Sequence, residues 1–211
     1  MKLPSERRPA QRWALVFLCL AAAASTAGGC ASSPKIRTTS PFTDRDAEVF
    51  DGSVDFVADP RALQGRWEEE YVADMQHRVG RLDLLAVVEI DTIRNDLTPE
   101  GRSQYRLFAK IDRVLFESDD FDVDELELNV RDGEPGYPTV ADNQRRILNE
   151  PFIAFVKFAP PEVSGEAPVP RWHLSPVSEP ILEEIRALLQ ERDPGAMKDT
   201  GSRRVFVHDD E

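Results

Sequence analysis

Histidine, serine and aspartate are among the residue types in this chain that could carry out catalysis. His77, His173 and His208 lack the i, i+4 partner of an HExxH zinc helix. His173 and Ser175 stand two residues apart in a predicted strand, so alternation places a base and a nucleophile on one face. Pro176 marks the end of that strand, and no orienting acid is evident nearby. We therefore expect His173 to be an exposed histidine at a sheet edge.

The second candidate is the acidic segment that contains Asp120, Asp122 and Asp124. Its alternating carboxylates have the spacing of a calcium loop, but that loop requires Gly where Glu125 stands and Glu where Arg131 stands. We interpret the segment as a solvated acidic turn rather than a calcium site. The chain also lacks GxSxG, P-loop and GxGxxG motifs. The sequence thus predicts no catalytic residues, no metal, no cofactor and no enzymatic activity.

Aromatic and arginine side chains are the candidates for a binding surface, because these residue types are enriched at interface hot spots. The possible interaction surface comprises Trp67, Tyr71, Arg145, Arg146 and Trp172. At amphipathic spacing the alternative for the aromatic residues is a place in the core, which the pattern favours. The two arginines form a basic pair in an acidic chain and could bind carboxylates of this chain or of a partner.

The first 29 residues have the composition of a secretory signal peptide. Four basic residues and one acid precede an uncharged run over 13–29, whose strongly apolar part is 13–24. A helix that spans a membrane requires about 20 predominantly apolar residues. This run falls short of that length, so cleavage is favoured over a retained membrane helix.

The run ends in Ala27-Gly28-Gly29-Cys30, which resembles the lipobox of bacterial lipoproteins. The resemblance covers only this segment, and it departs from the family at Ala27, where leucine is preferred. It implies that the Cys30 sulfur receives a diacylglycerol and that cleavage falls between Gly29 and Cys30. Ala31 is not the aspartate that resembles an inner-membrane retention signal. The resemblance therefore implies an envelope lipoprotein on the outer membrane, facing the periplasm.

Charge and cysteine content limit the possible partners. The net charge is −13, and loss of residues 1–29, with four basic residues and one acid, makes it −16. Such a surface repels nucleic-acid phosphates and anionic lipid headgroups, so attachment to the membrane must come from the lipid. Cys19 leaves with the signal peptide, and Cys30 is consumed by lipid. No thiol remains for a disulfide, a zinc site or a nucleophile.

Hydrophobic periodicity predicts an α+β domain over 44–193, preceded by a signal peptide (1–29) and a lipid-attached flexible tether (30–43) and followed by a mobile tail (194–211). Apolar residues at every fourth position predict an amphipathic helix from Asp59-Pro60 to Gly80, and Ser178 caps a second helix that ends at Asp193. Alternation between these helices predicts five strands, near 84–93, 105–116, 125–131, 152–158 and 171–174.

This order predicts a five-stranded, mainly antiparallel sheet or OB-like barrel with an N-terminal and a C-terminal amphipathic helix. It resembles OB-type barrel modules of the netrin/tissue-inhibitor kind in the strands around 87–88, 106–114 and 152–158. We expect a lipid-anchored envelope protein that binds a protein or another envelope component. One alternative is a hydrolase whose carboxylates converge only in three dimensions. Another is a protease-inhibitor-like module, in which lipid on Cys30 would block the terminal cysteine that grips zinc in that family.

Overall fold

The computed structural model describes residues 40–118, 124–161 and 166–192. The expectations for the signal peptide, for Gly29 and Cys30, for the tether as far as residue 39 and for the C-terminal tail lie outside these residues. Asp120 and Asp122 of the acidic segment also lie outside them, because residues 119–123 are not described, whereas Asp124 is described. No helix within the described part of the chain is long and apolar enough to cross a membrane.

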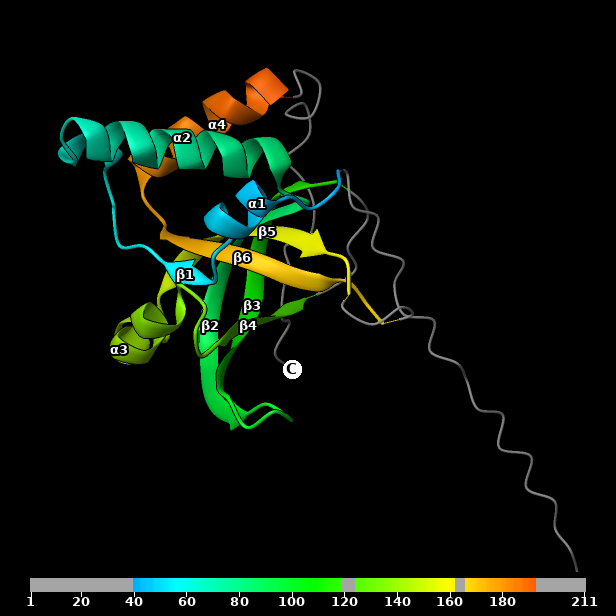
Figure 1. Cartoon of the computed structure of the whole chain (residues 1–211). Helices are drawn as coiled ribbons and strands as arrows, with labels where there is room; N and C mark the ends of the chain where they lie inside the picture. Colours follow the sequence, from blue (N-terminus) through cyan, green and yellow to red (C-terminus); the bar gives the residue numbers. More distant parts are fainter. Residues whose placement is uncertain (1–39, 119–123, 162–165, 193–211) are drawn as a thin grey trace, which may run out of the picture. The chain divides into compact units, whose positions relative to one another are not determined.

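Four α-helices and six strands make up the described residues (Figure 1). In chain order they are α1 (Asp44–Val49), β1 (Ser53–Val54), the short 3₁₀ helix η1 (Pro60–Ala62), α2 (Arg66–Arg81), β2 (Leu84–Leu97), β3 (Ser103–Glu117), β4 (Glu125–Arg131), α3 (Tyr137–Ile147), β5 (Pro151–Ala159), β6 (Val169–Pro176) and α4 (Glu179–Arg192). The α+β class is therefore confirmed.

The sheet has the strand order β1-β6-β5-β2-β3-β4, with β1 parallel to β6 and all other pairs antiparallel. It is thus a six-stranded mixed sheet, where the sequence predicted five strands. The extra strand, β1, is two residues long and has no alternation of its own, so its pairing depends on β6. The strand register of β2 and β3 shifts at three places. One shift skips Asp112, which forms a β-bulge in β3.

The bulges bend the sheet into a curled half-barrel in which β4 approaches β6. The indole Nε1 of Trp172 on β6 donates to the carbonyl oxygen of Asn129 on β4 at 2.9 Å. The curl encloses one apolar core, and α3 contributes Val140 and Ile147 to it. A second core lies between the other face of the sheet and helices α1, α2 and α4. Strand β5 serves both cores.

The helices differ from the sequence prediction in three ways: α2 begins later than expected, and α1 and α3 were not expected. Asp59 caps only η1, and α2 starts at Arg66 because Gly65 adopts a φ of +58°, a left-handed conformation that interrupts a helix. Helix α1 was missed because it is short. Helix α3 was missed because it begins in a glycine- and proline-rich stretch that resembles a loop. Pro138 lies in the first turn of α3, where its missing N–H costs no hydrogen bond. The cap of α4 is confirmed, since the amide of Ile181 donates to Ser178 Oγ at 3.4 Å.

We expect Phe155→Asp to abolish folding. Phe155 is fully buried between β5 and the helices, whereas Phe152 of the same strand lies in the other core. Losing a buried phenylalanine costs about 3–5 kcal/mol, and an unpaired buried charge costs several more, which is comparable to the whole stability of a domain. Circular dichroism and urea unfolding measure the effect. Asp112→Ala, at an exposed position, is the control and should change stability by about 0.5 kcal/mol or less. Native-like unfolding of Phe155→Asp would contradict the central place of β5.

Candidate functional site

The most concentrated group of reactive side chains surrounds His173 on β6. Its Nδ1 lies 3.0 Å from Asp51 Oδ1, and its Nε2 lies 3.0 Å from Asp55 Oδ2. Both aspartates flank β1, which pairs with β6 so that Ser53 lies opposite His173. The expectation of an exposed edge histidine is wrong, because β1 is added outside β6 and leaves the His173 residue only 4% exposed.

Two serines and a tyrosine complete what we call the His173 cluster, which consists of His173, Asp51, Ser53, Asp55, Tyr71 and Ser175. Ser53 Oγ donates to Asp51 Oδ1 at 2.7 Å and lies 3.2 Å from the histidine Nδ1. Ser175 Oγ donates to Asp55 Oδ2 at 2.6 Å, and the Tyr71 hydroxyl donates to the same oxygen at 3.3 Å. His173 and Ser175 thus share a face as alternation predicted, with a carboxylate bonded to both.

The carboxylates of the cluster are held in the ionised form. Burial alone would raise the pKa of Asp51 and of Asp55, but the hydrogen bonds and charge of His173 outweigh it, so both pKa values lie below the ordinary range. Carboxylates only accept hydrogen bonds, so both contacts of His173 are satisfied when both ring nitrogens carry a proton. The arrangement then matches a cation with two anions.

A buried arginine lies behind the cluster. Arg78 of α2 donates from Nε to the carbonyl oxygen of Val49 at 2.8 Å, and its guanidinium carbon lies 6.0 Å from the ring centre of Phe155. The Phe155 ring in turn packs edge-on against the His173 ring at 6.5 Å. Burial lowers the pKa of Arg78, although the charges of Asp55 and Asp51 oppose this shift. The arginine therefore places a buried positive charge near the two aspartates.

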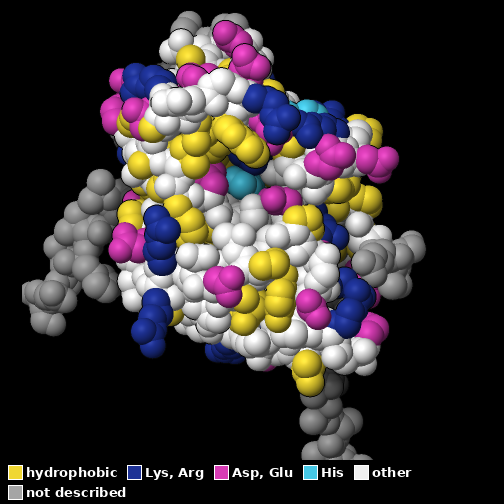
Figure 2. Space-filling view, turned by 60° about the vertical axis from the view of Figure 1, so that its left-hand side comes forward, with side chains coloured by type: hydrophobic (Ala, Val, Ile, Leu, Met, Phe, Trp, Pro, Cys, Tyr) yellow, Lys and Arg dark blue, Asp and Glu magenta, His cyan; other side chains and the backbone are white. Residues whose placement is uncertain are grey.

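The His173 cluster is better arranged to hold the chain than to attack a substrate. His173 contacts Ser53 on one ring nitrogen and Asp55 on the other, as the histidine of a catalytic triad contacts its serine and aspartate. However, Ser53 donates to Asp51, and Ser175 is fully buried. The neighbouring amides are also occupied, since Gly52 N–H bonds to the Trp172 carbonyl and Ser53 N–H to Asp51. These two amides cannot serve as an oxyanion hole. Figure 2 shows a histidine set back in a hollow between carboxylates.

Close backbone packing holds the same loop from the side of α3. The amide of Gly136 donates to the carbonyl oxygen of Asp51 at 3.2 Å. A Cβ atom at position 136 would lie 2.0 Å from the carbonyl oxygen of Gly52, a separation that no side chain tolerates. Glycine at this position therefore permits α3 to contact the backbone beside Asp51 directly.

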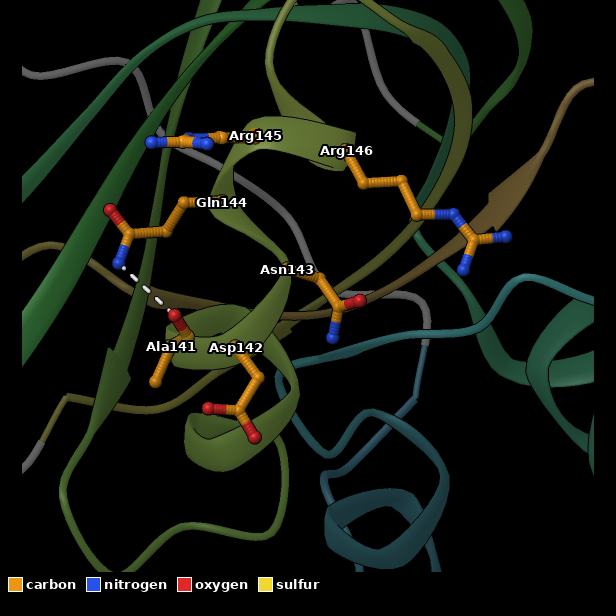
Figure 3. Close-up of a pocket in the computed structure, with 6 residues that line it drawn as sticks. All are labelled: Ala141, Asp142, Asn143, Gln144, Arg145 and Arg146. Atoms are coloured by element: carbon orange, nitrogen blue, oxygen red, sulfur yellow. Dashed lines mark hydrogen bonds between the residues drawn. The ribbon is translucent and has the colours of Figure 1, made fainter.

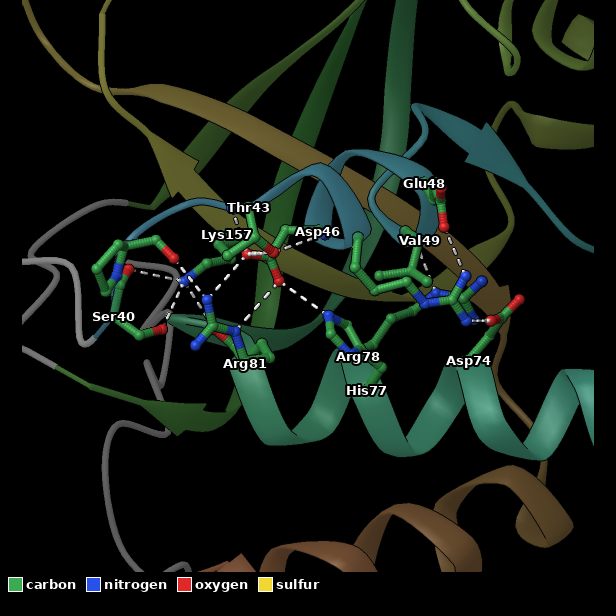
Figure 4. A network of polar contacts seen from close by, with 12 residues as sticks. Ser40, Thr43, Asp46, Glu48, Val49, Asp74, His77, Arg78, Arg81 and Lys157 are labelled. Atoms are coloured by element: carbon green, nitrogen blue, oxygen red, sulfur yellow. Dashed lines mark hydrogen bonds and ion pairs between the residues drawn. The ribbon is translucent and has the colours of Figure 1, made fainter.

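A second polar network connects α1, α2 and β5 (Figure 4). Asp46, fully buried, forms a capping box with Thr43, while its carboxylate oxygens lie 3.0 Å from Arg81 Nη2 and 3.0 Å from His77 Nε2. Burial raises the pKa of Asp46, but hydrogen bonds from Arg81, Thr43 and His77 outweigh it and hold the pKa well below the ordinary range. Asp46 therefore holds α1 on α2.

Lys157 of β5 extends this network to the start of the described chain. Its side chain is fully buried, with Nζ 3.2 Å from the carbonyl oxygen of Ser40, 3.1 Å from Ser40 Oγ and 3.0 Å from the carbonyl oxygen of Arg81. Asp83 Oδ2 lies 3.8 Å away. Burial lowers the pKa of Lys157, while the charge of Asp83 opposes the shift. These contacts fix the segment from Ser40 to Asp46 on the domain.

The structure does not bring the five predicted interaction residues together. Trp67 is 63% exposed at the start of α2, where the Arg66 guanidinium lies 5.3 Å from its ring centre. Tyr71 is half-buried and belongs to the His173 cluster, and Trp172 is 1% exposed. Trp172 is thus a core residue, the alternative that the spacing favoured.

Arg145 and Arg146 lie at the end of α3 and point to different sides (Figure 3). The Arg146 guanidinium lies 3.7 Å from the ring centre of Phe56, whereas Arg145 is exposed and has no ion pair or hydrogen bond with a described residue. Both border a shallow depression of about 480 Å³ around the kink at Asn143. The predicted basic pair is therefore divided between an aromatic contact and solvent.

Sequence reasoning missed the partners of His173, although a signal was present. Asp51, Ser53 and Asp55 are polar residues at every second position, the pattern of a strand with one polar face. No group of three His, Cys, Asp or Glu side chains suited to a metal ion occurs among residues 40–118, 124–161 and 166–192. No protein-family model matches the chain, and the searches of curated proteins and of solved structures find no match.

We expect Asp55→Asn to reduce the acid sensitivity of the fold. The pKa of Asp55 is lowered in the folded state, so its carboxylate stabilises the protein at pH values above the unfolded-state pKa of about 3.9. This stabilisation is lost as the pH falls through the folded-state pKa. Removing one partner of a buried ion pair costs about 3 kcal/mol. The stability gap between wild type and variant should therefore be constant from pH 7 to about 5 and shrink toward pH 3, measured by urea unfolding.

Asp112→Asn is the control for this titration, because Asp112 is exposed and has no partner among the described residues. Its stability difference from wild type should stay small throughout. A gap for Asp55→Asn that is independent of pH would show that the Asp55 charge does not hold the cluster.

Proposed function

We propose that the protein is a lipid-anchored envelope protein, attached through Cys30 to the outer membrane and facing the periplasm, whose acidic domain binds a protein or another envelope component. The signal peptide and the Ala27–Cys30 segment support the anchor. The exposure of Trp67 carries the proposal of binding. Its large ring stands in solvent and belongs to neither of the two apolar cores of the domain.

Only Trp67, Leu97 and Val114 are large apolar side chains exposed on the described residues. Trp67 is the only aromatic among them, and tryptophan next to arginine is the composition most enriched in interface hot spots. The contact with Arg66 pre-orders both side chains on the first turn of α2, which lowers the entropy lost on binding. This end of α2 is the region where we expect a partner to bind.

Lipidation is tested by metabolic labelling of the full chain with palmitate. Wild type should incorporate the label and remain in the membrane fraction, whereas Cys30→Ala should do neither, because the acylated sulfur is removed. Cys19→Ala is the matched control and should label like wild type. Equal labelling of Cys30→Ala would contradict the anchor and leave the binding proposal to be judged separately.

Binding is tested by cross-linking in cells followed by recovery of the full chain from detergent extracts. Trp67→Ala should lose its cross-linked species, because truncating a hot-spot tryptophan costs 2 kcal/mol or more, about a thirtyfold loss of affinity. Leu97→Ala, which removes another exposed apolar side chain, should retain them. Unchanged cross-linking in Trp67→Ala would remove the support for this surface.

A hydrolase is the second candidate, because His173 contacts both Ser53 and Asp55, the three residue types of a catalytic triad. It ranks lower because Ser53 donates to Asp51 and the neighbouring amides are occupied. Purified full chain incubated with p-nitrophenyl acetate should show no hydrolysis that Ser53→Ala abolishes. Hydrolysis that disappears in Ser53→Ala but persists in Ser118→Ala would favour the hydrolase instead.

A further inference from the structure

A groove of about 340 Å³ lies where η1, the stretch of α2 from Glu68 to Met75 and the first half of α4 meet. Its lining residues are Pro60, Arg61, Glu68, Val72, Met75, Pro180, Glu183 and Glu184. They come from three elements separated in sequence, so the groove depends on the docking of α4 on α2, and the second core fixes that docking. It is a property of the folded domain and not of one flexible segment.

The floor of the groove is apolar. Met75 is fully buried beneath it, and the half-buried Val72 lies one turn earlier on the same stripe of α2. Met75 and Pro60 are buried, so the apolar surface that an incoming group can contact comes mainly from the half-buried Val72 and Pro180. The groove can therefore receive an apolar anchor.

The rim of the groove is acidic and unpaired. Glu68, Glu183 and Glu184 make no ion pair or hydrogen bond with any residue that the structure describes, and the guanidinium of Arg61 is already paired with Asp59 at 2.9 Å. By contrast, Glu70 and Glu179 on the same helices are paired, with Arg66 at 3.1 Å and with Arg186 at 2.8 Å.

Part of this charge has a simpler origin. An acid such as Glu68 in the first turn compensates the dipole of α2. Glu183 and Glu184 lie beyond the first turn of α4, so the dipole of that helix does not account for them. Arg61 of the same lining also interacts with the charge of Glu183, but its guanidinium is paired with Asp59. The rim therefore carries three carboxylates against one arginine and has a net negative charge.

We propose that this groove docks a segment of a partner protein in which one apolar side chain is flanked by lysine or arginine. The proposal rests on the proposed function as a binding module and names the chemistry of its partner. The volume suits one anchor side chain, while basic side chains can lay their apolar stems on the floor and reach the rim carboxylates with their charged ends. The negative rim repels nucleic acid and anionic headgroups, and opposite charge accelerates encounter with a basic segment.

The probe is a fluorescein-labelled peptide of sequence Gly-Lys-Lys-Leu-Lys-Lys-Gly, titrated with the full chain in nonionic detergent and followed by fluorescence anisotropy. Wild type should bind it, and affinity should fall as salt is added. A peptide with glutamate in place of every lysine should not bind. Replacing the leucine with serine should weaken binding about tenfold, because the apolar anchor is lost.

Glu183→Lys should weaken binding of the lysine peptide at least tenfold. Glu191→Lys is the matched control, since it makes the same charge change at an exposed position of α4 outside the groove. Circular dichroism should show both variants folded, and Glu68→Lys provides a second rim variant from α2. Equal losses in Glu183→Lys and Glu191→Lys, or no binding by wild type, would overturn the proposal. Cross-linking that depends on Trp67 would still stand in that case, so the two failures are distinguishable.

Discussion

The burial of β5 on both faces is the constraint on which the rest of the domain depends. Its side chains face alternately into the curl of the sheet and toward the helices, so one strand divides the molecule into two cores. Two apolar faces require a cover on each side. The curl of the sheet and α3 provide one cover, and α1, α2 and α4 provide the other. The position of every helix therefore follows from the requirement to exclude water from a strand that has no exposed face.

Polar contacts act together with apolar burial to position the chain between Ser40 and Val57, where Val49, Phe50 and Val54 enter the two cores. Lys157 holds Ser40, Asp46 holds α1 on Arg81, and the His173 cluster holds β1 on β6. Buried charges are costly to desolvate, and each group here is matched by opposite charge or by hydrogen bonds. These networks fix geometry more than they add stability. They also explain why reactive side chains converge without an open catalytic arrangement.

Local pattern predicted the elements whose periodicity is strong, and distant pairing decided the others. The hairpin of β2 and β3, the apolar strand β5 and the two long helices have regular spacing that a single sequence displays. Strand β1 was not predictable, because its partner β6 lies about 120 residues away and two residues show no period. The same separation hid the carboxylates of His173. Periodicity also could not distinguish Trp67 from Trp172, because exposure depends on which residues cover each ring.

Helix α2 connects the two ends of the molecule that the proposed function requires to be separate. At its C-terminal end, Arg81 bonds to Asp46 and to the carbonyl oxygen of Pro41, so the chain that arrives from Cys30 is fixed there. At its N-terminal end, Trp67 is exposed and Glu68 is half-buried. At a rise of about 1.5 Å per residue, about 20 Å separates Glu68 from Arg81. In a lipid-anchored protein, a partner held at the Glu68 end of the groove would therefore not displace the contacts of Arg81 that attach the domain to its tether.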